Sequence, residues 1–278
     1  MNTLYHLSIV KTAFRDHLSP AAIDTVARYN FNTDFYGVIG WKALNWKVFP
    51  LYPFARRWYQ ELDHFDHWQE PEKIIENWRM HRDLIMEIAD DKKHPPGKLE
   101  SMYRILGRSS HAISDLTSHT NFVPMLFEYY SEDEEAKAKL LESGMTAAEY
   151  IPENAPTFGH VLNLPAYARF REKYLPKLFA FISVPDEGPR SHSECGMDSP
   201  NEPRTYGNLH PGIFKSVYRI SERDVSNIVR ELFDKLKIEN PAKFQALAED
   251  RRDILIGPDG GPRERRARFW AQKVGGWD

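Results

Sequence analysis

Residues 111–123 read HAISDLTSHTNFV and carry three ligand-type side chains within a predominantly apolar helical run. His111, Asp115 and His119 follow one another at intervals of four residues. Each interval advances about 40° around an α-helix, so the three side chains share a face about 80° wide. Imidazole and carboxylate ligands together suit zinc or iron better than calcium. We therefore expect a helix with a metal-binding face here. The alternative is that two surface histidines line up with an aspartate by chance.

Helical patterns continue on both sides of this stretch. Apolar spacing, prolines at the first helical position and capping residues, Ser131 among them, predict helices at 4–14, 19–28, 70–88, 98–119, 131–142, 165–182, 212–238 with a break near Ser221, and 241–252. Residues 30–53 mix Asn, Asp and Gly with aromatic residues, which predicts an ordered aromatic loop with short helical pieces, or alternatively strands. Residues 183–207 are expected to form a long loop. The sequence has no repeat and no alternating strand series. The predicted fold class is all-α, a multi-helix bundle around a metal cluster with long ordered loops.

The length of 278 residues suits one large domain or two small ones. We expect a single all-helical metal-binding domain at 1–256, followed by a basic C-terminal tail at 257–278. The tail begins with the turn sequence 257–262 and continues into an arginine-rich run at 263–268. Such a run is expected to be solvated, with phosphate contact as the less favoured alternative.

Composition excludes several function classes. The net charge of −3 does not favour a stable nucleic-acid complex or attraction to anionic lipid. A single cysteine, Cys195, excludes an intrachain disulfide framework. The sequence has neither a recognisable signal peptide nor an apolar stretch of the roughly 20 residues that a transmembrane segment needs. We therefore expect a soluble, cytoplasmic protein. Export without a cleaved signal peptide is the alternative that stays open.

Further ligands are available before the helix at 98–119. The segment 63–67 reads DHFDH and precedes a predicted helix, so it suits a metal site, the alternative being a polar surface turn. Asp34 lies among aromatic residues and is either a ligand, a general base or an ordinary turn residue. His6 lies in an otherwise apolar helix, where a core histidine without a metal is the usual interpretation.

In their order and spacing, these residues resemble the zinc-dependent phospholipase C superfamily, which includes single-strand-specific zinc nucleases. They are most similar to its Het-C branch. The resemblance lies mainly in the first 125 residues and rests on His6, Asn30, Thr33-Asp34, His64-Phe65-Asp66, Leu106-Gly107-Arg108, His111, Asp115, Ser118-His119 and Asn121-Phe122.

The resemblance implies an all-helical fold that holds up to three zinc ions in a cleft. The metal ligands that it implies are His6, Asp34, His64, His111, Asp115, which would bridge two ions, and His119. His210 is our choice for a further ligand, ahead of His160 and His192.

Two departures from the secreted bacterial members favour two ions over three. Those enzymes bind a metal through a mature N-terminal amine, whereas this chain begins with methionine and shows no cleavable leader. They also place a Glu four residues after the last histidine, and the corresponding position here is Phe214.

The activity that the resemblance implies is hydrolysis of a phosphodiester or phospholipid-like substrate by zinc-activated hydroxide. Asp34 or Asp66 would orient the water as the catalytic carboxylate. Arg108 would bind the substrate phosphate, the alternative being an ordinary surface arginine. The aromatic segment 31–46 would form an apolar wall for a lipid, although packing explains it equally well.

Three other functions remain open. The first is a non-hydrolytic, di-iron-like metalloenzyme, although the usual pair of Glu-x-x-His motifs is absent. The second is a binding protein with a degenerate metal site. The third is a histidine-aspartate phosphohydrolase, whose adjacent His-Asp doublet is absent because His81 and Asp83 are one residue too far apart. The residues leave the oligomeric state and the substrate's identity open.

Overall fold

The computed structural model describes residues 3–42, 63–65, 70–132, 134, 137–138, 155–181, 195–197 and 211–249. The helices are α1 (Thr3–Phe14), α2 (Pro20–Lys42), α4 (Pro71–Met86), α5 (Leu99–His119), α6 (Phe122–Glu132), α9 (Phe158–Asn163), α10 (Ala168–Lys173), α13 (Pro211–Glu239) and α14 (Pro241–Ala248), with short 3-10 helices η3 (Glu87–Ala89), η4 (Pro165–Tyr167) and η5 (Leu175–Lys177). In this part of the chain the sole β contact is an isolated bridge between Thr120 and Ala180. The predicted all-α class is therefore confirmed.

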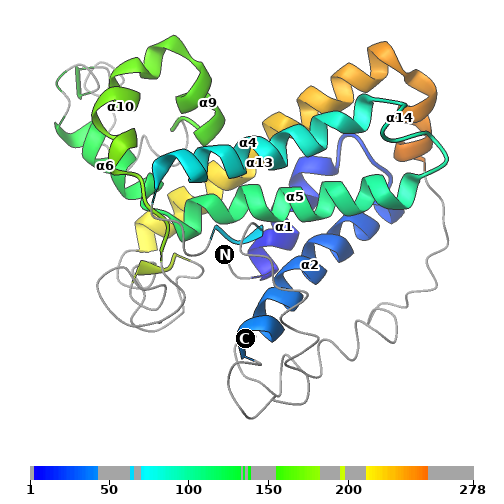
Figure 1. The fold of residues 1–278 in the computed structure, drawn as a ribbon, viewed down its shortest axis with the longest axis horizontal. Coiled ribbons are helices and arrows are strands. Elements are labelled where there is room, and N and C mark those ends of the chain that lie inside the picture. The colour runs from blue at the N-terminus through cyan, green and yellow to red at the C-terminus, as the bar shows by residue number, and fades with distance from the viewer. Residues whose placement is uncertain are drawn as a thin grey trace.

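Helix α5 is the centre of the bundle. It packs against α2, α13 and α4, while α1 packs against α13 and α2. Figure 1 shows α5 running across the middle of the molecule, with α6, α9 and α10 gathered at one end and α14 at the other. Every residue of α5 from Ser109 to His119 is buried, whether polar or apolar. Polar side chains in this half of the helix must therefore find partners inside the protein.

A glycine sets how closely α2 and α5 approach. A Cβ atom on Gly107 would lie 2.5 Å from the carbonyl oxygen of Val26 and 2.7 Å from the backbone nitrogen of Asn30. Both are main-chain atoms of α2, so a larger residue would push the two helices apart. Gly107 precedes His111 by one turn of α5, and this close crossing therefore holds the ligand-bearing part of α5 in place.

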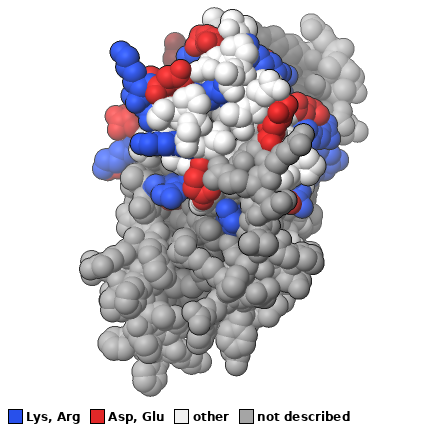
Figure 2. All heavy atoms as spheres, turned by 90° about the vertical axis from the view of Figure 1, so that its right-hand side faces the viewer, with Lys and Arg blue, Asp and Glu red and all other residues white. Residues whose placement is uncertain are grey.

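The surface at the α14 end carries mixed charge. Figure 2 shows lysine, arginine, aspartate and glutamate side chains interspersed on this face, without a large patch of one sign among the described residues. Several are paired, as in the 2.6 Å contact between Lys93 Nζ and Glu87 Oε1. None of the helices in the described residues combines the length and the hydropathy of a transmembrane span.

Three predicted helices, those at 4–14, 70–88 and 98–119, agree closely with the structure, and the helix predicted at 19–28 begins where expected but continues beyond residue 28. The predicted aromatic loop at 30–53 is wrong for residues 30–42, because α2 continues to Lys42. The Asn, Asp and Gly residues there have weak helix propensity, but each costs less than about 1 kcal/mol and they do not end a helix whose first half packs closely against α5. Residues 43–53 lie outside the described part of the chain.

The predicted helix at 165–182 is wrong as a single helix. The chain instead forms η4, α10 and η5 in succession. Pro176 lies within η5, and a proline in a helix interior removes a backbone donor and clashes with the preceding turn. This explains why α10 does not extend through the segment.

The predicted break near Ser221 is also wrong, since α13 is one helix from Pro211 to Glu239. Ser221 is buried inside it, and its hydroxyl donates to the carbonyl oxygen of Ser114 on α5, 3.1 Å away. Ser131 does not cap a new helix. It lies within α6, and its hydroxyl donates to Phe127 O at 2.8 Å. The last predicted helix is shorter than expected, because α14 ends at Ala248.

The described part of the chain leaves some predictions untested. It includes residues 195–197 of the predicted long loop at 183–207, and nothing of the predicted tail at 257–278. The boundary predicted between domain and tail lies outside it as well.

Candidate metal centre

Two helices and a short turn bring five ligand-type side chains to one buried point. His6 comes from α1, His64 from the turn at residues 63–65, and His111, Asp115 and His119 from α5. All five are buried, with exposed fractions between 0% for His6 and His111 and 8% for His119. The two alternatives, surface histidines on the helix and a polar surface turn at His64, are therefore wrong, because the helix face and His64 are both buried.

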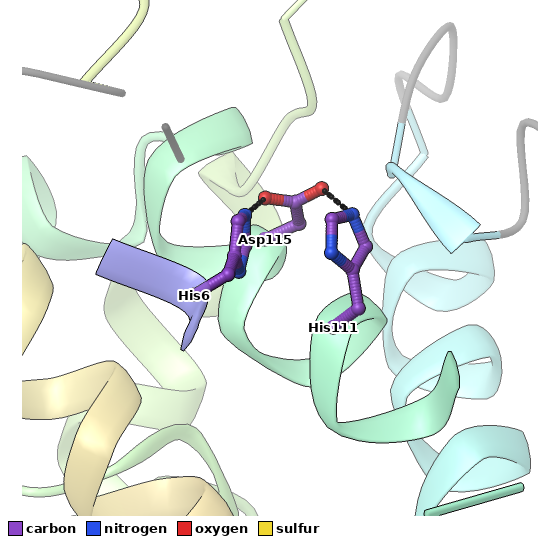
Figure 3. A group of neighbouring side chains, drawn as sticks. All are labelled: His6, His111 and Asp115. Atoms are coloured by element: carbon purple, nitrogen blue, oxygen red, sulfur yellow. Dashed lines mark ion pairs between the residues drawn. The ribbon is translucent and has the colours of Figure 1, made fainter. Parts of the chain in front are cut away.

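The carboxylate of Asp115 lies at the centre of this group. Its Oδ1 is 2.9 Å from Nε2 of His6 and 3.9 Å from Nε2 of His119. Its Oδ2 is 3.1 Å from Nε2 of His111 and 3.1 Å from Nδ1 of His64. Figure 3 shows the rings of His6 and His111 reaching different oxygens of the carboxylate. Each oxygen therefore faces two imidazoles, as in a carboxylate that bridges two cations.

Three potential ligand atoms, Asp115 Oδ2, His111 Nε2 and His64 Nδ1, form a triangle and are spaced like neighbouring ligands of one metal ion. The edges are the two 3.1 Å contacts of Asp115 Oδ2 and the 3.3 Å separation of His111 Nε2 from His64 Nδ1. Ligands at zinc-to-nitrogen distances of 2.0–2.1 Å in a tetrahedron are about 3.3 Å apart. His6, His111 and Asp115 also offer ligand atoms that all lie within 4.8 Å of one another. This buried group can hold a metal ion.

Ser114 determines which nitrogen of His6 carries the proton. The Ser114 hydroxyl donates to the carbonyl oxygen of His111, 2.8 Å away, so its oxygen accepts from Nδ1 of His6, 2.7 Å away. In the neutral ring, Nε2 then presents a lone pair to Asp115 Oδ1 at 2.9 Å. Two acceptors this close require a cation between them, either a metal ion or a proton.

The ring of His119 is oriented in a similar way. Its Nδ1 lies 2.7 Å from the carbonyl oxygen of His64, which can only accept a hydrogen bond. Nδ1 therefore carries a proton, and in the neutral ring the lone pair is on Nε2, which lies 3.9 Å from Asp115 Oδ1. Hydrogen bonds of this kind on the far nitrogen are the usual support of metal-binding histidines.

Protonation of the site favours metal binding. Burial, together with the neighbouring His6, lowers the pKa of His111 to about 4, so the His111 imidazole is neutral near pH 7. Burial alone would raise the pKa of Asp115, but its interactions with surrounding groups, including His119, His111 and His6, bring it well below the usual value. Neutral imidazoles around an ionised carboxylate are the forms that bind zinc.

The structure therefore unites five of the seven predicted ligands, namely His6, His64, His111, Asp115 and His119. Asp34 lies on α2, with its side chain outside the described part of the chain. Asp66, His192 and His210 lie outside the described residues altogether.

Other predicted site residues have different surroundings. His160 belongs to a capping box with Thr157 at the start of α9, which gives it a structural role. Phe214, at the position where the secreted enzymes carry Glu, packs edge-on against Tyr5 with ring centroids 4.7 Å apart. Arg108, predicted to bind substrate, donates from Nε to both carboxylate oxygens of Asp63 at 2.8 Å.

Sequence reasoning missed Ser114 and the role of Asp63. Ser114 is three residues after His111, and no local pattern indicates that it contacts His6 from another helix. Asp63 stands next to His64 and was considered only as part of a ligand-rich segment. Ser114 bonds to His6 and Asp63 bonds to Arg108, and both bonds join segments that are distant in the sequence.

No protein-family model matches the chain, and neither the curated proteins nor the solved structures contain a significant match to it. The geometry of this buried histidine–aspartate group is therefore the feature of the protein that bears most directly on its function.

Proposed function

We propose that the protein is a zinc-dependent phosphoric-ester hydrolase, similar in its reaction to phospholipase C. The observation that carries this proposal is the position of Asp115, whose two carboxylate oxygens each face two histidines inside the protein. A bridging carboxylate of this kind suits two adjacent metal ions, the arrangement that hydrolases use on phosphate esters.

The balance of ligands supports zinc over iron. The described group contains four histidines and one carboxylate. Di-iron sites in helical bundles use several glutamates together with Glu-x-x-His motifs. A histidine-rich set of ligands is typical of catalytic zinc. When bound, zinc in such a site activates water as a nucleophile near neutral pH and stabilises negative charge on phosphoryl oxygens.

The chain's own residues prepare the site for this chemistry. Ser114 and the carbonyl oxygen of His64 orient the rings of His6 and His119. Asp115 remains ionised and offsets part of the cation charge. His64 and His119 retain slight exposure, at 6% and 8%, so a substrate phosphate would approach from their side of the group. Phosphodiesters and phospholipid head groups are the substrate class that we propose.

Metal analysis of the purified protein, together with assays on a chromogenic phosphodiester and on phospholipid vesicles, tests the proposal. We expect two zinc ions per chain and measurable hydrolysis of at least one substrate. Loss of a residue that hydrogen-bonds to a metal ligand lowers activity by up to roughly 100-fold. His111→Ala and Asp115→Ala each remove a ligand itself, so each should lower activity by more than this.

His17→Ala is the matched control, because His17 stacks on Phe233 with ring centroids 4.9 Å apart and contacts none of the five ligands in the described structure. It should retain zinc and activity. Iron in place of zinc would contradict the proposal, and so would full activity in His111→Ala and Asp115→Ala.

A further inference from the structure

We propose that Asp63, Arg108 and His81 form a clamp that holds His64 in position to bind the metal. Arg108 is then a positioning residue that acts through Asp63 and not a ligand of the substrate. The inference rests on the metal centre of the proposed function, but it concerns hydrogen bonds outside that centre.

Asp63 is the anchor of the clamp. Its carboxylate is almost fully buried, and both of its oxygens accept from Nε of Arg108 on α5 at 2.8 Å. Nε2 of His81, on α4, lies 3.7 Å from Oδ1 of the same carboxylate. A buried carboxylate is stable only with such partners, so Asp63 binds the turn to two helices at once.

The helices on either side of the clamp are themselves connected. Nδ1 of His81 is 3.3 Å from the hydroxyl oxygen of Ser109, which is the residue after Arg108 on α5. Arg108 precedes His111 by three residues on the same helix. The clamp therefore fixes the position of His64 relative to α5, the helix that carries three of the other ligands.

The turn that carries His64 needs external support. Phe65 has a φ of 54°, the left-handed region that is costly for a bulky side chain. Its ring is fully buried, which holds this end of the turn in the core. Asp63 holds the other end. His64 lies between the two anchors, and its Nδ1 reaches Asp115 Oδ2 at 3.1 Å.

The clamp affects a second ligand as well. The carbonyl oxygen of His64 accepts from Nδ1 of His119 at 2.7 Å, and this bond orients the His119 ring. Displacement of the turn would therefore remove one imidazole from the metal and release the orientation of another.

Zinc affinity in a double-mutant cycle tests the inference. Asp63→Ala should lower zinc affinity about 10- to 100-fold, as expected for a partner that orients a ligand. If Asp63 acts through the turn that carries His64, Asp63→Ala should weaken zinc binding less in the His64→Ala background than in the wild type, the remaining effect coming from the bond of His119 to the carbonyl oxygen of residue 64. X-ray absorption of the zinc-loaded Asp63→Ala protein should show fewer imidazole ligands than the wild type. Additive losses in the cycle, or unchanged affinity and ligand number, would overturn the inference.

Arg108→Ala and Arg108→Lys provide second variants if Asp63→Ala does not fold. Lysine keeps the charge but cannot reproduce the Nε contact with both oxygens, so Arg108→Lys should also weaken zinc binding. Arg82→Ala is the matched control, because Arg82 pairs with Glu231 at 2.7 Å in an exposed contact between α4 and α13. It should leave zinc affinity unchanged.

A metal-free measurement separates failure of the clamp from failure of the proposed function. In crystals of metal-free Asp63→Ala or Arg108→Ala, His64 should leave Asp115, and His119 should lose its bond to the His64 carbonyl. If His64 keeps its wild-type position in both variants, the clamp is refuted, whatever metal the wild type binds. If the wild type binds no zinc, the proposed function is contradicted. The metal-free crystal structures still test the clamp, because they do not depend on zinc binding.

Discussion

The hydroxyl oxygen of Ser114 lies 2.7 Å from Nδ1 of His6, although 108 positions separate the two residues in the chain. The same hydroxyl donates to His111 O within α5. One side chain therefore connects α1 to the central helix and directs Nε2 of His6 towards Asp115. The preparation of the site for a cation depends on this contact between helices.

Replacing Ser114 by Ala should weaken zinc binding without removing any ligand. Nδ1 of His6 would lose its acceptor, so the tautomer with its lone pair on Nε2 would no longer be favoured. We expect zinc affinity to fall about 10- to 100-fold, measured by competition with a chromophoric chelator. Ser216→Ala is the control, since this buried helical serine donates to Gly212 O within its own helix. Equal affinity in Ser114→Ala and the wild type would contradict the assigned role.

The metal-free protein should lose stability in mild acid. The folded-state pKa of His111 is about 4, whereas the unfolded chain has the ordinary value of 6.5. The unfolded state therefore binds more protons between these values, and the free energy of unfolding falls as the pH decreases from 6.5 to 4. The contribution of His111 is on the order of 3 kcal/mol at full protonation of the unfolded state. Urea denaturation of the apoprotein between pH 4 and pH 7.5 measures it.

His111→Gln provides the comparison for this pH dependence. Glutamine does not titrate, so the decrease in stability between pH 6.5 and pH 4 should be smaller in the variant. Asp115 adds a loss only at lower pH, because its folded pKa lies well below the usual value and its contribution disappears as the pH falls through that folded pKa. An unchanged slope in His111→Gln would show that other groups cause the acid sensitivity.

Replacing Gly107 by Ala should destabilise the fold. The added Cβ would lie within 2.7 Å of main-chain atoms of α2, and these can move only with the helix. Overpacking of this kind costs about 1–3 kcal/mol, measurable as a lower urea midpoint. Gly212→Ala is a matched helical control with no atom within 4 Å of its added Cβ, and it should be neutral or slightly stabilising. Similar midpoints for the two variants would show that α2 and α5 do not need the glycine.

Zinc should raise the thermal stability of the wild type. A ligand that binds only the folded state at 100 times its Kd stabilises it by about 2.7 kcal/mol. Differential scanning calorimetry should show this as a higher Tm, reversed by a chelator. Asp115→Asn should lose most of the increase, because one oxygen of the bridging carboxylate is replaced by an amide nitrogen that cannot bind zinc. If zinc raises the Tm of Asp115→Asn as much as it raises that of the wild type, Asp115 is not the central ligand.

Local sequence patterns were sufficient to predict the helical class and the face shared by His111, Asp115 and His119. Spacing of four residues places side chains on one face of any α-helix, whatever surrounds it. The same patterns failed for the second half of α2, where the helix continues through Asn and Gly residues to Lys42. They also failed at Ser221, whose hydroxyl bonds across to α5 while α13 continues unbroken.

By itself, the sequence determined an all-helical chain and three aligned ligand-type side chains on one of its helices, because these features depend on neighbours within a few turns. Only the tertiary structure decided that His6 and His64 join them, since that depends on the close crossing at Gly107 and on the packing of α1 against the bundle. It also decided that Arg108 contacts Asp63. Contacts between distant segments arise from the packing of whole helices, and local periodicity carries no information about them.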